Sequence, residues 1–176
     1  MSTSPANAAR LIELGLSQNE AEALERAWSI DLIHHLLGDV AQAIHEGGGT
    51  AAEAVDFAMH KLDESSASMY RSNGFTAHQA HLIESEPQAH NNLFDRNTLS
   101  TADFLDADAP REFIVQVLRV AHSPGEADRF LNRYLRAAAG RPVLIDGAAD
   151  TAQGVLDEVA VIAQHLSTID CDCDFD

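Results

Sequence analysis

The chain has 176 residues, a formal net charge of -17 at pH 7 and 45% hydrophobic residues. This composition favours a globular protein over a disordered one, and no apolar run approaches the ~20 residues that a membrane helix needs. An acidic surface repels nucleic-acid backbones and anionic membranes, so we expect neither as a partner. The opening M-S-T-S-P-A-N lacks the features of a secretory signal, which favours a cytoplasmic or intravirion protein, not a secreted one.

Helix-start signals organise the first half of the chain. Two capping-box sequences, S-Q-N-E at 17–20 and T-A-A-E at 50–53, each precede a long apolar periodicity. They predict helices at about 18–46 and 51–73, separated by the three glycines 47–49. We expect these two long helices to form a hairpin that leads the fold.

Shorter elements follow this hairpin. Thr76 is a suitable cap for a helix at about 77–85, which Pro87 is expected to end. Residues 87–99 then read as a loop, and Ser100 can open a one- or two-turn helix that runs to Asp106.

Three further helices are predicted, at 110–121, 124–140 and 150–168. The first is apolar nearly all round, which places it at the centre of the core. The last has an apolar stripe on one face, formed by Val155, Val159, Ile162, Leu166 and Ile169. Residues 141–147 (R-P-V-L-I-D-G) resemble a strand without a partner, and so an extended connector or an edge donated to another chain. The predicted fold class is all-α, a single-domain bundle of about seven helices.

The domain prediction separates a helical domain, residues 1–168, from an acidic C-terminal tail, residues 169–176. Charge supports this division, because residues 142–176 hold eight acids and no lysine or arginine. Residues 111–141, in contrast, hold six arginines and three acids. The basic segment therefore lies directly before the most acidic one.

Three of these arginines are spaced i, i+4, i+7 on the helix predicted at 124–140: Arg129, Arg133 and Arg136. This spacing places them on one helix face, opposite a predicted apolar stripe of Ala127, Phe130, Leu131, Tyr134 and Leu135. The sequence therefore predicts a basic ridge on an otherwise acidic protein.

The tail ends in D-C-D-C-D-F-D, which places the apolar Phe175 among aspartates such as Asp172 and Asp174. It resembles the acidic, phenylalanine-bearing tail tips with which bacterial single-stranded-DNA-binding proteins recruit partners, and this resemblance implies a partner-binding role. We expect the tail to bind the basic ridge of a neighbouring copy, or a partner protein. The alternative is a solvated tail without a partner.

Nine histidines raise the possibility of a metal site. Two helix faces combine imidazole and carboxylate groups: Asp31, His35 and Asp39 on the first long helix, and Glu53, Asp56, His60 and Asp63 on the second. The apolar stripes lie on the opposite sides, so these groups are expected to face solvent. His78, His81 and Glu84 could share a metal on one helix face, but no fourth ligand is identifiable. No metal or cofactor is predicted, and a helical metal-binding protein stays as an alternative.

The segment H-H-L-L-G at 34–38 resembles the H-x-L-[KR]-G segment of histidine phosphotransfer domains, which are also helical bundles. The resemblance implies phosphotransfer through His34. The chain departs from the family pattern at Leu37, where a basic residue is usual, and at Asp39, where a small residue is usual.

Nucleophile and phosphate-loop motifs are absent from the sequence. There is no G-x-S-x-G, and the glycines 47–49 lack both the lysine and the preceding strand of a phosphate cradle. We therefore expect a non-enzymatic protein that acts through protein–protein contacts, as an oligomeric structural or adaptor subunit such as a virion component. An acidic inhibitor that mimics nucleic acid is a further alternative.

Overall fold

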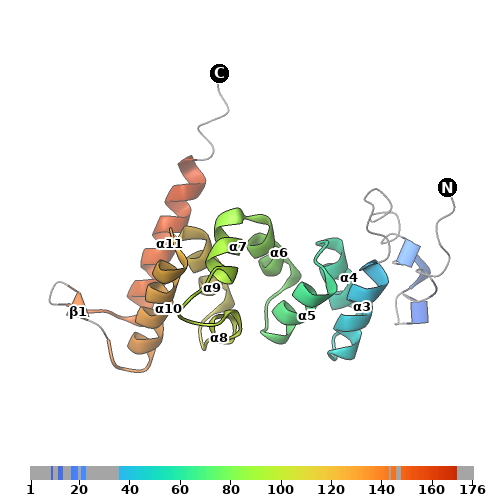
Figure 1. Cartoon of the computed structure of the whole chain (residues 1–176), viewed down its shortest axis with the longest axis horizontal. Coiled ribbons are helices and arrows are strands. Elements are labelled where there is room, and N and C mark those ends of the chain that lie inside the picture. Colours follow the sequence, from blue (N-terminus) through green and yellow to red (C-terminus); the bar gives the residue numbers. More distant parts are fainter. Residues whose placement is uncertain are drawn as a thin grey trace, which may run out of the picture. The chain divides into compact units, whose positions relative to one another are not determined.

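The computed structural model describes residues 9, 12–13, 17–19, 21–22, 36–142, 144–145 and 148–169. Nine helices and two very short strands lie in this part of the chain, which confirms the all-α prediction (Figure 1). Among the same residues, no helix is both long and apolar enough to cross a membrane. The chain divides into two compact units, Met1–His81 and Leu82–Asp176.

The first unit is built around α3 (Leu36–Glu46), α4 (Ala51–Met59) and α5 (Glu64–Ser72), with α3 packed against both of the others. Its core consists of apolar side chains from all three helices and the turns that join them: Val40, Ile44, Ala54, Phe57, Ala58, Leu62, Ala67, Tyr70 and Phe75. Burial of this apolar surface is the main force that stabilises the unit.

The predicted long helix at 51–73 is wrong in one respect, because it is two helices. The chain leaves α4 at His60, and Lys61 takes a left-handed φ of 56°. Asp63 then caps α5, and its carboxylate accepts a hydrogen bond from the Ser66 N–H at 2.8 Å. An aspartate that can cap a new helix competes with helix continuation, which explains the break. For the predicted helix at 18–46, residues 23–35 lie outside the described part.

The glycine breaker at 47–49 is confirmed, and two of its members have a specific role. Gly48 has a φ of +78°, which is a left-handed conformation that other residues rarely adopt. A Cβ on Gly49 would lie 2.5 Å from Cγ2 of Ile44, so only glycine fits this close approach to α3. The turn is also held from α5, because Arg71 donates to the Gly47 carbonyl at 2.7 Å.

The helix predicted at 77–85 is confirmed as α6 (Ala77–Ser85), and Thr76 accepts a hydrogen bond from the Gln79 N–H. The predicted loop at 87–99 is wrong, because α7 (Pro87–Phe94) lies there. Proline has no N–H and a φ suited to the first helical position, so Pro87 begins a helix where it was expected to end one. Ser100 caps the short α8 (Thr101–Leu105) as predicted.

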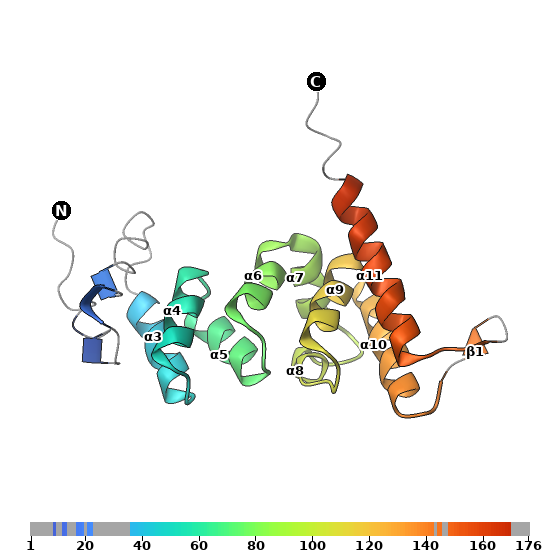
Figure 2. The ribbon, with the colours of Figure 1, turned by 180° about the vertical axis from the view of Figure 1, so that it is seen from behind.

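The second unit is centred on α9 (Arg111–Val120), as its apolar sequence predicts. This helix packs against α7, α10 (Pro124–Ala138) and α11 (Ala152–Ile169). Figures 1 and 2 both show α9, α10 and α11 side by side. The side chains of α9 that are buried cover most of its circumference: Phe113, Ile114, Val115, Val117, Leu118 and Val120.

The segment expected to be a strand without a partner does find one within the chain. Strand β1 (Leu144–Ile145) pairs antiparallel with β2 (Ala148–Ala149). The sequence between the two strands is Asp-Gly, which is typical of two-residue hairpin connections and is the signal that predicts the pairing. The predicted boundary between domain and tail stays a prediction, because 170–176 lie outside the described residues.

Candidate functional site

The three arginines of the predicted ridge have different surroundings. Arg129 and Arg136 are exposed, as expected. Arg133 binds two carboxylates of its own chain: its Nε lies 2.8 Å from Oδ2 of Asp150, and its Nη2 lies 2.7 Å from Oε2 of Glu158. Glu158 and Asp150 raise the pKa of Arg133, since both stabilise the charged guanidinium. The middle of the ridge therefore anchors α10 to the start of α11.

Other arginines of the basic segment also have partners within the chain. Arg119 donates through Nε to both carboxylate oxygens of Glu86, and Arg111 donates to the carbonyls of Ala107 and Ala109. The surface that a partner can reach is therefore less basic than the sequence predicts. The tail residues that were predicted to bind this ridge lie outside the described part of the chain: Asp172, Asp174 and Phe175.

A hollow of about 270 Å³ lies beside the ridge, where α10 meets α11. Its lining is Glu126, Arg129, Phe130, Arg133 and Glu158. Two carboxylates thus balance two guanidinium groups, and the ring of Phe130 supplies an apolar wall. A hydrogen bond from the backbone N–H of His122 lowers the pKa of Glu126, which keeps that carboxylate ionised. This mixture of charges suits an amphipathic ligand better than a purely anionic one.

The second half of α11 extends past its packing partners (Figures 1 and 2). Val155 and Val159 are fully buried, as the predicted apolar stripe requires. The same stripe continues to Leu166, which is 42% exposed, and Val161 on the opposite side is 66% exposed. Residues 164–166 are all exposed, so this turn is less buried than the turns that hold Val155 and Val159. Periodicity could locate the stripe but not the point where its partner helices end.

This half of α11 is also uncharged. Between residues 159 and 169 the chain has no aspartate, glutamate, lysine or arginine, although its net charge is -17. An exposed apolar and uncharged helix end on a strongly charged protein is the kind of surface that binds another protein. It was missed in the sequence because the apolar residues were all assigned to the core.

A buried ion pair lies at the centre of the second unit. Arg96 pairs with Asp128 of α10, and their side chains are only 1% and 8% exposed. Arg96 also donates to the Asn92 carbonyl, and its guanidinium lies 3.6 Å from the ring centroid of Phe104. Asn92 in turn donates to the carbonyls of Leu118 and Ala121. The network ties α7, α8, α9 and α10 together, and we interpret it as structural.

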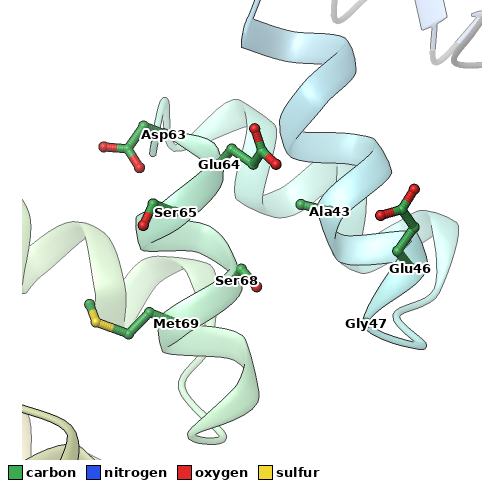
Figure 3. Close-up of a pocket in the computed structure, with 8 residues that line it drawn as sticks. All are labelled: Ala43, Glu46, Gly47, Asp63, Glu64, Ser65, Ser68 and Met69. Carbon is green, nitrogen blue, oxygen red and sulfur yellow. The ribbon is translucent and has the colours of Figure 1, made fainter.

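An open acidic cleft of about 850 Å³ lies between α3 and α5 in the first unit (Figure 3). Its carboxylates come from Glu46, Asp63 and Glu64. Figure 3 shows that Glu64 points toward α3 whereas Asp63 points away from it. Asp63 is also engaged as the cap of α5. The carboxylates are therefore spread along the rim and do not converge on one ligand position.

The histidine sets predicted from sequence are rearranged in the structure. His60, at the end of α4, lies beside two histidines of α6, with ring centroids 6.0 Å from His78 and 5.5 Å from His81. Glu84 does not join them, since its carboxylate lies 3.6 Å from His90. His34, the residue of the phosphotransfer resemblance, lies outside the described residues, as do Asp31 and His35.

As they stand, no three His, Cys, Asp or Glu side chains of the described residues converge on a point where they could hold a metal ion. The arrangements that the structure offers are thus the α10–α11 surface, the acidic cleft and the histidine cluster. Comparison of the chain with protein-family models, with curated proteins and with solved structures finds no match.

Proposed function

We propose that the protein is non-enzymatic and acts through protein–protein contacts, as an oligomeric structural or adaptor subunit. The observation that carries this proposal is the second half of α11, which has no formal charge and leaves the apolar side chains of Val161 and Leu166 exposed. A subunit of a larger particle, such as a virion, is one form of such an assembly.

The exposed half of α11 gains stability from a partner. A helix end that buries little of its apolar surface is less stable in water, because most helical stability in proteins comes from packing. Burying a large aliphatic side chain contributes about 1.5–3 kcal/mol. Val161 and Leu166 lie on opposite sides of α11, so a single partner buries only one of them fully. Association costs about 4–15 kcal/mol in lost freedom, so these two side chains alone support only weak binding.

The tail supplies the additional contacts, and a second copy of the chain is the partner that fits. Two copies can meet at residues 159–169 without like-charge repulsion, because this segment has no formal charge. The seven residues that follow have a reach of roughly 23 Å when extended. Helix residues 158–169 span about 16 Å, so the tail of one copy is long enough to reach Arg129 and the hollow of the other.

Within this contact the parts have different roles. Val161 and Leu166 supply apolar area. In the proposed dimer, Phe175 would fill the hollow against Phe130 of the other copy. The tail aspartates would pair with Arg129 and Arg136, which are the exposed members of the ridge. Arg133 stays bound to Asp150 and Glu158 and acts as part of the scaffold.

Light scattering behind size exclusion tests the proposal on the full chain and on a chain that ends at Thr168. We expect a concentration-dependent oligomer for the full chain, and a weaker one for the shortened chain, with a salt dependence that only the full chain shows. Val161→Ser with Leu166→Ser should abolish assembly. Leu144→Ser is the matched control, since Leu144 is 70% exposed but lies in the β-hairpin.

A second set of variants tests the electrostatic attraction between the tail aspartates and the exposed arginines of the ridge. Arg129→Glu with Arg136→Glu should remove the salt dependence, whereas Arg141→Glu, at another exposed arginine, should leave assembly unchanged. A full chain that is monomeric at every concentration contradicts the proposal. Such a result is expected if the tail folds back onto its own α10–α11 surface.

A further inference from the structure

Three imidazoles from two helices meet on the surface of the first unit. His60 is the C-cap of α4 and its side chain is 24% exposed. His78 and His81 are exposed on α6, three residues apart, and therefore on one face of that helix. His60 is distant in sequence from the other two, and only the fold brings it beside them.

His60 is held in an orientation that suits a metal ligand. Its Nδ1 lies 2.8 Å from the Asp56 carbonyl oxygen and 3.5 Å from the Asp56 carboxylate. A carbonyl oxygen can only accept, so Nδ1 carries the proton and Nε2 of the neutral ring keeps its lone pair. Metal-bound histidines commonly donate their second nitrogen to a carbonyl or carboxylate in this way.

The ring separations are close to those of a shared ion. A Zn–N bond is about 2.1 Å and the centroid lies roughly 1.1 Å further, so imidazoles on a tetrahedral ion have centroids roughly 5 Å apart. The centroids of His60 and its two neighbours are 5.5 and 6.0 Å apart. The side chains do not converge as they stand, so His78 and His81 must shift toward Nε2 of His60 to share an ion with it. Exposed histidines can make such a shift by changing rotamer.

We propose that His60, His78 and His81 form a binding site for a divalent transition-metal ion. Three neutral imidazoles are a ligand set that suits Zn²⁺, Ni²⁺ and Cu²⁺. They leave the fourth position of a tetrahedral ion open to water or to a side chain of a partner. A bound ion also links the end of α4 to α6, so it stabilises the first unit. This inference is independent of the proposed oligomeric function.

Zinc titration of the full chain tests the site, by calorimetry and by thermal unfolding. The background carries Cys171→Ser and Cys173→Ser, so that the tail thiols do not bind the ion. We expect one saturable zinc ion per chain and a higher melting temperature in its presence. His78→Ala and His81→Ala should each weaken binding about tenfold or more, and the pair together should abolish it.

Two controls separate a site from a structural effect. His122→Ala, in the second unit and 87% exposed, should bind zinc as tightly as the background chain. The His78 and His81 variants should melt like the background chain when no metal is present, because both side chains are exposed. Unchanged affinity in these two variants, or an equal loss in His122→Ala, would overturn the proposal, as would the absence of saturable binding in the background chain.

Discussion

Arg96 and Arg133 both bind carboxylates within the second unit, yet their surroundings have opposite effects. Arg96 is almost fully buried, and burial lowers its pKa to about 10. Arg133 has a side chain that is 21% exposed, and its carboxylate partners raise its pKa. Both guanidinium groups are charged at neutral pH. Burial disfavours the charged form of Arg96, whereas the carboxylate partners of Arg133 favour its charged form.

The difference indicates what each pair does for the fold. A buried pair contributes little net stability, since desolvation offsets the attraction, but removing one partner leaves a buried charge that is not compensated. A partly exposed ion pair has a smaller desolvation cost and a weaker attraction, and dissolved salt screens that attraction. We therefore expect the Arg96 pair to be sensitive to a single substitution and insensitive to salt. The Arg133 pairs should be less sensitive to a single substitution and more sensitive to salt.

Arg96→Met has the largest expected effect of the substitutions that test this comparison. It leaves Asp128 buried without its partner, so the free energy of unfolding should fall by about 3–5 kcal/mol. Urea unfolding followed by circular dichroism measures the loss, and hydrogen exchange should place it in the second unit.

The double variant Arg96→Met with Asp128→Leu is the matched control. It replaces the pair with apolar side chains, so most of the lost stability should return. If the single and double variants are equally unstable, the loss comes from packing around Phe104 or from the Asn92 hydrogen bond, and not from the orphaned charge.

Arg133→Met should lower the free energy of unfolding by about 1–2 kcal/mol, because each of its two ion pairs contributes at most about 1 kcal/mol. High salt should shrink the difference from wild type, as measured by urea unfolding at two ionic strengths. A loss as large and as independent of salt as that of Arg96→Met would remove the distinction between the two arginines.

Glu126→Gln should have the smallest effect, a few tenths of a kcal/mol at neutral pH, because this carboxylate only helps to cap α10. The folded-state pKa of Glu126 lies below 4.5, owing chiefly to the His122 N–H. Its stabilising contribution is therefore present above pH 4.5 and is lost as the pH falls through the folded pKa. Unfolding midpoints from neutral pH down to about pH 3 should show the variant converging with wild type.

A Glu126→Gln difference that does not change with pH would show that the hydrogen bond from His122 does not stabilise the ionised carboxylate.

Local signals in the sequence predicted most helices correctly. Thr76 and Ser100 are caps in the structure as they were in the prediction, and α9 is central because its own residues are apolar nearly all round. Such signals act within one or two turns, so the sequence carries them completely. The two errors at Pro87 and Asp63 are also local, because each residue fits both a helix end and a helix start.

The candidate sites depended on contacts that no local pattern contains. The amphipathic pattern correctly places Arg133 opposite the core. Its ion-pair partners Asp150 and Glu158, however, follow the β1–β2 hairpin and cannot be inferred from the pattern of α10. His60 and His81 are neighbours only because the chain turns back between α4 and α6.

The sequence by itself determined the all-α class, the central helix and the apolar stripe of α11, because caps and periodicity are properties of neighbouring residues. Only the tertiary structure decided which arginine stays exposed, which histidines meet, and where the stripe of α11 loses its partners. These depend on the lengths and packing of helices that are distant in sequence, and no periodicity within one helix records them.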